Sequence, residues 1–429
     1  MITLAQSRTW RFINLAVLYS AQGVPNGLFT VAVPSWMATQ DYATAAIASF
    51  IGIVTLPWSL KLLAAPLMDR FTFLDMGFRR PWILAAQFSL ILTFLQFGWI
   101  PEDLIWMSSL GALANTFAAT QDVAVDGMAI DILPEKDRAT ANAFMFGGQY
   151  LGRGIGASGG GYALTYLGLA EAGFFAAAYM LIVLSFPLMF LERPGEKRLP
   201  WSQGRATQRA LKKLNSLALI KKTGSMLILP ASVLLILNQF TGAAAIGICV
   251  ALLPVYTVKE LAIANTDFND FNAIGALIGA VFGVLIAPFF DRISAYRAHW
   301  YTSAFLVVVV AALPLTVSDY PLASIVALTV ASQLTVITVI ATMMKFCHPT
   351  VAATQFAIYM ALGNLSTSIG TFTYAGISHW VDYSDSLWLA ATLATSGFIF
   401  WAVLGRYLDS APDTSLTHES AQPEPRQSR

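Results

Sequence analysis

Four charged residues lie inside long apolar segments of this 429-residue chain: Lys61, Asp122, Asp126 and Arg153. A charge at the centre of a bilayer costs roughly 2.5–3.5 kcal/mol on insertion scales, so such residues usually face a protein interior and have a role there. Asp122 and Asp126 are four positions apart and share one helix face. At about 1.5 Å of rise per residue, Lys61 and Asp122 reach a similar depth, and we expect them to pair. The pair is either structural or one that opens when a proton or an anionic solute arrives.

Arg153 falls near the middle of the apolar segment 139–165, within the glycine-rich stretch 147–156. Small residues let two helices approach closely. A guanidinium forms paired hydrogen bonds with carboxylate and phosphate groups, so a lone arginine here suits an anionic group on a solute. Asp126 lies nearer the end of its segment, where a latch or a snorkelling side chain is favoured over a proton carrier.

Polar uncharged residues indicate a wet cavity close to these charges. Gln22 and Asn26 share a face of the first apolar segment, and Asn238 with Gln239 interrupts the seventh. Trp58 comes three residues before Lys61 and either lines the same cavity or packs against its wall. In lipid such groups need partners, so hydrogen bonding between helices is the alternative for each polar residue. With Arg153, these are the predicted solute-binding residues.

The sequence offers no catalytic or metal-binding pattern, and we expect neither a cofactor nor a metal. The histidines are predicted at loop edges or in the tail, with no nucleophile arrangement around them: His299, His348, His379 and His418. Cys249 and Cys347 lie in apolar stretches, which argues against a disulfide framework. No glycine-rich phosphate-binding loop is present. These observations argue against an enzyme.

The elements that position these side chains must be membrane helices. The chain is 56% hydrophobic and only 11% charged, against about 25% charged in soluble proteins, and its mean hydropathy is +0.63. This composition excludes a soluble enzyme, a nucleic-acid binder, a secreted disulfide scaffold and a disordered chain. The net charge of +1 says nothing about a partner.

The apolar runs are long and do not alternate, which indicates helices rather than a β-barrel. We predict an all-α membrane protein with twelve transmembrane helices. Their expected ranges are 11–37, 44–68, 82–100, 104–130, 139–165, 171–191, 226–256, 268–290, 298–317, 320–345, 351–380 and 385–406. The first run is too long for a signal-peptide core and is expected to be a retained span.

The basic residues predict the orientation of these spans. With the N-terminus inside, Lys259 is the one basic residue in an outer loop, while Lys61 and Arg153 lie within spans. The rest of the 25 Lys and Arg residues then fall on the cytoplasmic side. We therefore expect a protein of the cytoplasmic (inner) membrane with both termini in the cytoplasm.

The polar stretch 192–224 separates six predicted spans from six. It holds nine Lys and Arg residues and two Glu residues. Its apolar residues recur at helical spacing, so it is either an amphipathic helix attracted to anionic inner-leaflet lipids or a solvated linker. The predicted units are an N-terminal bundle (1–191), this basic linker (192–224), a C-terminal bundle (225–406) and a disordered tail (407–429).

Two pairs of similar segments, one member of each pair in each half, predict that the six-helix units are pseudo-repeats. Residues 65–70 read Ala-Pro-Leu-Met-Asp-Arg and residues 287–292 read Ala-Pro-Phe-Phe-Asp-Arg; segments 139–156 and 353–370 match at several positions under a shift of 214. Two six-helix repeats are typical of the major-facilitator architecture, whose solute site lies between the halves.

The loop after the second span resembles the signature loop of that superfamily. It carries Asp69, Arg70, Arg79 and Arg80. We expect these arginines to pair with carboxylates at the inner end of the fourth span, such as Asp126 or Asp131, and so to latch one conformation. Topological anchoring by positive charge is the alternative.

Four motifs together resemble the major-facilitator branch of AmpG-type muropeptide permeases and acetyl-coenzyme A transporters. They are Gln-Gly-Val-Pro-Asn-Gly-Leu (22–28), Pro-Trp-Ser-Leu-Lys-Leu-Leu-Ala-Ala-Pro (57–66), Arg-Arg-Pro-Trp (79–82) and Ala-Thr-Gln-Asp-Val-Ala-Val-Asp-Gly (119–127). The resemblance implies proton-coupled or exchange transport of a sizeable, polar, often anionic solute. AmpG-type permeases commonly carry two further spans; compact siderophore importers also resemble this branch.

The sequence therefore predicts a monomeric secondary transporter that imports a polar, anionic small molecule with protons by alternating access. In this prediction the proton- or charge-coupling residues are Asp122, its partner Lys61 and Asp126, and Arg153 anchors the solute. The alternatives are an exchanger or exporter of an anionic metabolite, acyl-coenzyme A or siderophore-type compound, a membrane acyl-transfer enzyme, and a non-transporting sensor. Expected partners are the solute, protons and anionic lipids, with no nucleic acid.

Overall fold

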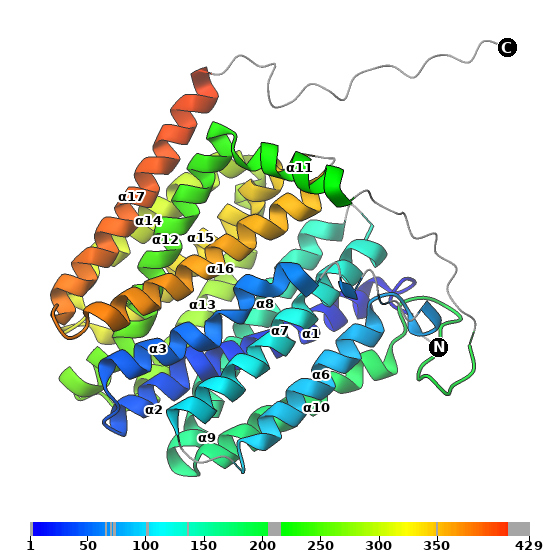
Figure 1. Cartoon of the computed structure of the whole chain (residues 1–429), viewed down its shortest axis with the longest axis horizontal. Helices are drawn as coiled ribbons and strands as arrows, with labels where there is room; N and C mark the ends of the chain where they lie inside the picture. The colour runs from blue at the N-terminus through cyan, green and yellow to red at the C-terminus, as the bar shows by residue number, and fades with distance from the viewer. Residues whose placement is uncertain are drawn as a thin grey trace.

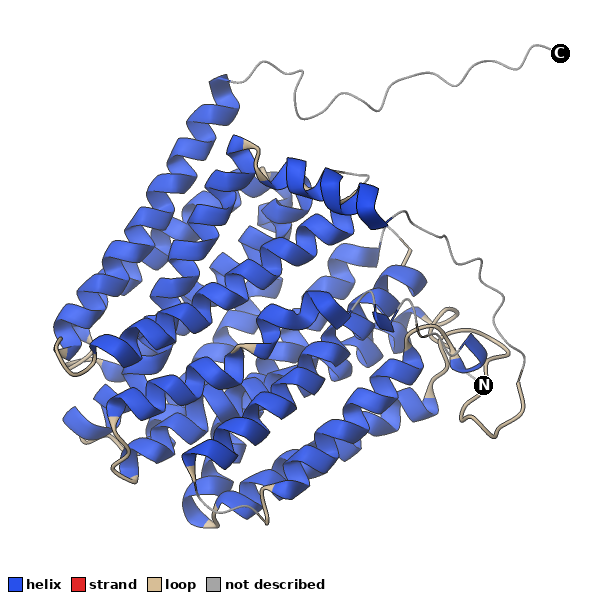
Figure 2. Ribbon diagram, viewed as in Figure 1, coloured by secondary structure: helices blue, strands red, loops and turns tan. Residues whose placement is uncertain are grey.

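The computed structural model describes residues 3–64, 67–68, 71, 74–99, 103–134, 137–204, 216–348 and 351–410. These residues are almost entirely helical (Figure 2), and their one β-bridge joins Thr3 to Leu191. The helices of the N-terminal half (3–191) are α1 (Arg8–Gly27), α2 (Val33–Thr39), α3 (Thr44–Thr55), α4 (Pro57–Leu60), α6 (Arg80–Gln96), α7 (Leu104–Ile132), α8 (Arg138–Gly154), α9 (Gly160–Tyr166) and α10 (Leu169–Met189).

The linker contributes α11 (Ser216–Leu227), which follows residues 205–215 outside the described part of the chain. The helices of the C-terminal half (225–410) are α12 (Pro230–Val255), α13 (Asn265–Arg292), α14 (Ala295–Thr316), α15 (Pro321–Phe346), α16 (Ala352–Ile377) and α17 (Tyr383–Ser410). In Figure 1, α11 and the far end of α17 lie along the same edge as the N-terminus, and α2 and α9 lie toward the opposite edge.

The all-α prediction is confirmed. Within the described residues, six helices are long and apolar enough to cross a membrane: Leu169–Met189, Pro230–Glu260, Asn265–Ile286, Ala295–Thr316, Pro321–Phe346 and Tyr383–Leu408. The other predicted spans also contain helix, but these helices are interrupted, shorter or more polar. The count of twelve transmembrane helices remains a prediction.

The second predicted span, 44–68, is not one continuous helix. α3 ends at Thr55, α4 begins at Pro57, and a 3-10 turn follows at Lys61–Leu63. Proline lacks the N–H that an α-helix would donate, and its ring clashes with the preceding turn. The break at Pro57 thus redirects the chain just before Lys61.

Two other predicted spans contain a π-helical turn, at Leu28–Ala32 after α1 and at Ile155–Gly159 after α8, and a third such turn, Tyr256–Glu260 after α12, begins at the last residue of the predicted span 226–256. Each turn holds an extra residue and rotates the helix beyond it, a feature often found at functional sites. Arg153 lies in the last turn of α8, two residues before the π-helical turn that begins at Ile155.

α1 and α8 are packed backbone to backbone. A Cβ added at Gly27 would lie 2.0 Å from the Arg153 carbonyl oxygen, and one at Gly156 would lie 2.2 Å from that of Val24. No side chain fits at either glycine, which confirms the close packing predicted from the small residues.

The same contacts recur between α12 and α16. A Cβ at Gly247 would lie 2.2 Å from the Thr367 carbonyl oxygen, and one at Gly370 would lie 2.2 Å from that of Ala244. Gly247 and Ala244 each follow their N-terminal counterparts by 220 positions, and Thr367 and Gly370 follow theirs by 214. The two halves therefore repeat one packing arrangement, with Thr367 in the place of Arg153.

Where the halves meet, α3 packs against α16 and α8 packs against α13. Figure 1 shows both pairs near the middle of the molecule. The interface places α1, α8, α12 and α15 around a common centre, where the candidate site lies.

Candidate solute-binding cavity

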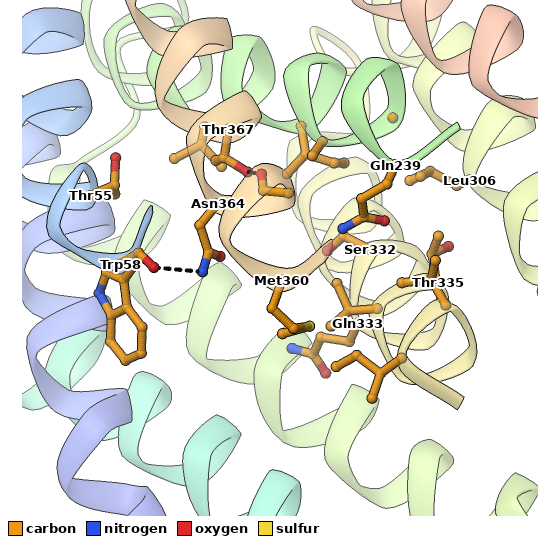
Figure 3. Close-up of a pocket in the computed structure, with 18 of the residues that line it drawn as sticks. Thr55, Trp58, Gln239, Leu306, Ser332, Gln333, Thr335, Met360, Asn364 and Thr367 are labelled. Carbon is orange, nitrogen blue, oxygen red and sulfur yellow. Dashed lines mark hydrogen bonds between the residues drawn. The ribbon is translucent and has the colours of Figure 1, made fainter. Parts of the chain in front are cut away.

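A cavity of about 310 Å³ lies between the two halves. Its walls come from spans of both: α1, α3, α4 and α8 on one side, and α12, α14, α15, α16 and α17 on the other. All six predicted solute-binding residues line it: Gln22, Asn26, Trp58, Arg153, Asn238 and Gln239. Figure 3 shows part of the wall, with Gln239, Gln333 and Asn364 among the amide side chains.

Arg153 is the only charged side chain among the described residues that line this cavity. Its Nε is buried without a hydrogen-bond partner, and within the described part of the chain no carboxylate lies within ion-pair distance of its guanidinium. A buried polar group without a partner is destabilising unless something else satisfies it. Arg153 therefore has hydrogen-bonding capacity to offer an anion in the cavity.

The polar wall residues differ in how much capacity they keep. Gln22 accepts a hydrogen bond of 3.3 Å from the Gln149 amide through Oε1, while its Nε2 is buried without a partner. Asn238 is already engaged, because Nδ2 donates to the Gly397 carbonyl (3.0 Å) and Oδ1 lies 3.1 Å from Nε2 of His299. Of these two, Gln22 has more to offer a solute.

Trp58 connects the cavity wall with both halves. Its indole Nε1 donates to Asn115 Oδ1 on α7 (2.8 Å), and its carbonyl accepts from Asn364 Nδ2 on α16 (3.1 Å), the contact drawn in Figure 3. Its ring centroid lies 5.9 Å from Lys61 Nζ. Trp58 is thus in contact with the cavity and with the charged group behind it.

The predicted pair of Lys61 and Asp122 is confirmed. Lys61 Nζ lies 2.9 Å from Asp122 Oδ2, and the side chains are only 13% and 6% exposed. Asp126, one turn further along α7, accepts a hydrogen bond from the Tyr19 hydroxyl on α1. The group thus joins three spans beside the cavity. Sequence reasoning did not single out Tyr19, since tyrosines are common in such segments.

The signature-loop prediction needs a correction at Arg80. Its guanidinium does not reach Asp126 or Asp131 but donates to backbone carbonyls of Met76, Pro187, Lys197 and Arg198. The Pro187 carbonyl belongs to the last turn of α10, where carbonyls lack helical partners and the helix dipole attracts a cation.

The remaining loop residues have mixed outcomes. Arg79 places its guanidinium 4.5 Å from the Phe78 ring centroid and lies against Gly127 of α7; its pairing with a carboxylate remains a prediction. Asp69 and Arg70 lie outside the described residues.

Glu192, just after α10, holds the start of α6. Its carboxylate accepts hydrogen bonds from the backbone N–H groups of Phe78, Arg79 and Arg80. Burial raises the pKa of the Glu192 carboxyl, while these three N–H donors oppose that rise. The loop that was predicted to latch onto α7 is therefore held by the end of α10.

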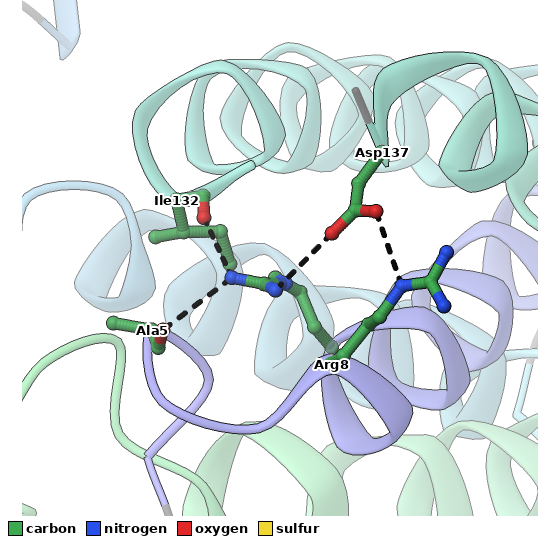
Figure 4. Close-up of polar contacts among 5 residues, drawn as sticks. Ala5, Arg8, Ile132 and Asp137 are labelled. Carbon is green, nitrogen blue, oxygen red and sulfur yellow. Dashed lines mark hydrogen bonds and ion pairs between the residues drawn. The ribbon is translucent and has the colours of Figure 1, made fainter. Parts of the chain in front are cut away.

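Charged contacts also fix the N-terminus at this end of the molecule. Arg8 Nε lies 3.1 Å and Arg11 Nη2 lies 3.5 Å from the Asp137 carboxylate. Arg11 also donates to the carbonyls of Ala5 and Ile132, as Figure 4 shows. These contacts tie α1 to the chain between α7 and α8.

His299 does not lie at a loop edge, and that prediction was wrong. α14 begins at Ala295, so His299 is one turn inside the helix, buried, and part of the cavity wall. Its ring nitrogens lie 3.1 Å from Thr338 Oγ1 and 3.1 Å from Asn238 Oδ1. Because the Asn238 oxygen can only accept, Nε2 of His299 carries a proton.

Comparison with known proteins gives the family. The profile of the Major Facilitator Superfamily matches residues 15–371. The anhydromuropeptide permease of Escherichia coli K12 is 25% identical over 293 residues, which are 66% of this chain and 56% of the permease. The chain thus matches little more than half the length of this curated relative.

Two solved structures share the fold. A D-xylose–proton symporter superposes with a TM-score of 0.69 at 12% identity, covering 92% of this chain and 97% of the symporter. A nucleoside transporter gives 0.68 at 12% identity, covering 92% and 99%. At this identity the likeness concerns the fold alone. The chain is an integral membrane protein that belongs to the Major Facilitator Superfamily, a family of secondary transporters rather than enzymes, and it is distantly homologous to the anhydromuropeptide permeases.

Proposed function

We propose that this protein is a secondary active transporter that moves a polar, anionic solute across the cytoplasmic membrane by alternating access. The observation that carries the proposal is the guanidinium of Arg153, which is without an ion-pair partner in the described part of the chain and lines a cavity shared by both halves. Hydrogen bonds between charged partners contribute about 1.5–3 kcal/mol each, which is ample for binding one acid group. Neighbouring amides and hydroxyls bind the rest of the solute.

The proposed coupling group is Lys61 with Asp122 and Asp126. A proton on Asp122 would release the Lys61 ammonium, and Trp58 would pass that change to the cavity wall because it contacts both. Proton entry from outside would then drive import. An exchanger would use the same cavity and keep the pair closed throughout.

Alternating access in this proposal rocks 1–191 against 225–406, with both termini in the cytoplasm and the protein acting as a monomer. On the side of α2 and α9, the halves are joined by polar contacts: Asp270 accepts from Ser158 and Tyr162, and Asn265 donates to Thr165 (2.7 Å). These contacts must break for the cavity to open there, since they lie between the two halves.

The test is solute flux in proteoliposomes under a pH gradient. The panel contains an anhydromuropeptide, suggested by the name of the Escherichia coli relative, acetyl-coenzyme A, a siderophore and gluconate. We expect concentrative uptake of at least one anion and its loss in Arg153→Gln. Arg153→Lys is the matched control; it keeps the charge but not the planar fork, so partial uptake is expected. Equal uptake by the wild type and Arg153→Gln would contradict the proposal.

A further inference from the structure

Gln333 on α15 is a buried amide without a partner. Its side chain is 4% exposed, and neither Oε1 nor Nε2 makes a hydrogen bond to any described residue. Buried polar groups in proteins are nearly always satisfied, and those that are not need an explanation. Gln333 lines the central cavity, so a solute is a partner within reach.

The backbone of α13 provides the space that Gln333 occupies. A Cβ added at Gly279 would lie 1.7 Å from Gln333 Oε1 and 2.6 Å from its Cδ. The glycine therefore leaves a notch into which the amide fits. One turn further on, a Cβ at Gly283 would meet only the tip of Ile337, at 3.0 Å.

Gln333 lies on the border between two cavities, as does Arg153 from the other half. A second cavity of about 60 Å³ adjoins the first, and both residues border both cavities, as do Thr30 and Ser332. A solute at this boundary is within reach of a guanidinium from the N-terminal half and an amide from the C-terminal half. Figure 3 shows Gln333 beside Met360 and Ser332 on the C-terminal side.

We propose that Gln333 is a solute-binding residue that selects for a group able both to donate and to accept a hydrogen bond. A primary amide offers one acceptor oxygen and two donor hydrogens, which match a hydroxyl or an amide on the solute. Arg153 binds the acid group, so the solute class is a small organic acid that carries hydroxyl or amide groups. This inference rests on the proposed function and adds a specificity determinant to the same cavity.

The experiment uses three six-carbon probes and titration calorimetry on the purified full-length protein. Gluconate has an acid group and hydroxyls, hexanoate has the acid group alone, and sorbitol has hydroxyls alone. We expect the wild type to bind gluconate about tenfold more tightly than hexanoate, the effect of about one net hydrogen bond. In Gln333→Met, the affinity for gluconate should fall about tenfold, while the affinity for hexanoate stays unchanged.

Matched variants separate this role from a structural one. Gly279→Ala leaves Gln333 in the chain but displaces its flexible amide, so this variant should lose the preference for gluconate over hexanoate. Gly283→Ala should keep that preference. Thr342→Val is a control on the same helix but outside both cavities, and it should leave the preference unchanged, because the Thr342 hydroxyl bonds to backbone carbonyls of Ala295 and Thr338. Gln333→Met should unfold at or above the wild-type temperature, since it removes an unsatisfied amide.

The outcomes are distinguishable. An unchanged ratio of gluconate to hexanoate affinity in Gln333→Met, with both acids lost in Arg153→Gln, would overturn the role of Gln333 and leave the proposed function standing. A marked fall in the unfolding temperature of Gln333→Met would likewise assign this amide to packing. Failure of the wild type to bind either acid more tightly than sorbitol would overturn the anion site and the role of Gln333 with it.

Discussion

In the N-terminal half the carbonyl of Arg153 lies against Gly27, and in the C-terminal half the carbonyl of Thr367 lies against Gly247 in the same way. Arg153 and Thr367 both line the cavity. The backbone arrangement is thus repeated, while a cation on one side is replaced by a neutral hydroxyl on the other.

A neutral hydrogen-bonded cluster, called here the polar corner, occurs at equivalent positions in both halves. On one side Gln87 Nε2 of α6 donates to Gln121 Oε1 of α7, whose Nε2 donates to the Leu18 carbonyl of α1. On the other, His299 of α14 lies between Thr338 of α15 and Asn238 of α12. Leu18 and Asn238 are 220 positions apart, like Gly27 and Gly247.

Both halves therefore contain a neutral polar corner, and in the N-terminal half the neighbouring face of α7 adds Asp122 and Asp126 with Lys61. A buried charge needs a partner, whereas a neutral amide needs only hydrogen bonds. This difference suggests a division of labour in which the first half handles charge and the second recognises neutral groups.

Moving the cavity cation should have the largest effect. Arg153→Thr should weaken anion binding about a hundredfold or more, because two charge-assisted hydrogen bonds are lost. Adding Thr367→Arg returns a guanidinium to the same cavity from the other half, and binding should partly recover. Uptake driven by a pH gradient should not recover, because the new cation belongs to the half that lacks the group of Lys61, Asp122 and Asp126. Full recovery of coupled uptake would show that the halves are interchangeable.

Breaking the Lys61–Asp122 pair tests whether it is structural or functional. Asp122→Asn leaves a buried ammonium without its partner and should destabilise the protein by about 3–5 kcal/mol. Lys61→Met with Asp122→Leu removes both charges and should restore much of the stability. Thermal unfolding measures the stability of both variants, and proteoliposome flux measures the uptake that the double variant retains. A double variant with full pH-driven uptake would make the pair purely structural; loss of that uptake with solute exchange retained would assign it to coupling.

The neutral corner of the C-terminal half should tolerate a neutral exchange. His299→Gln copies the residue type found at Gln87 and should cost about 1 kcal/mol, while His299→Leu leaves Asn238 Oδ1 without its donor and should cost about 1–3 kcal/mol. The pH profile of uptake should be the same in His299→Gln and the wild type. A shifted profile would place a proton-sensing group in this half and break the contrast.

The sequence predicted the composition of the cavity well. A polar residue in an apolar span must face protein, so Gln22, Asn238 and Arg153 were confined to the interior by composition alone. Similar depth in two spans was also enough to predict the contact of Lys61 with Asp122.

Partners that depend on helix rotation were not predictable in this way. The hydrogen bond from Tyr19 to Asp126 requires a particular rotation of α1 against α7, and the isolation of Gln333 depends on the notch at Gly279. Arg80 was assigned to carboxylates because charge was considered before helix ends, whereas unpaired carbonyls at the end of α10 were closer. The position of Arg80 could have been predicted only from the path that the chain takes after Met189.

The smallest expected effect concerns two side chains, one in each half, that accept hydrogen bonds from the backbone N–H groups of a loop. Glu192 caps the start of α6 with a carboxylate, while Gln355 of α16 accepts from the backbone N–H of His348 (2.9 Å) with a neutral amide. Because burial raises the pKa of Glu192 above its ordinary value of 4.5, the folded state binds its proton more tightly than the unfolded chain. The resulting stabilisation is complete below about pH 4.5 and is lost as pH rises through the folded-state pKa.

Glu192→Gln keeps one acceptor oxygen but cannot ionise. Its free energy of unfolding should therefore lack this component of the pH dependence, and the wild type should gain stability relative to Glu192→Gln as the pH is lowered. Gln355→Glu is the matched exchange in the other half and should introduce a pH dependence that the wild type does not have there. Denaturant unfolding from pH 4 to pH 8 measures both. Parallel curves for the wild type and Glu192→Gln would mean that the three N–H donors offset the effect of burial on the Glu192 pKa. Glu192 and Gln355 would then contribute equally little to the pH dependence of stability.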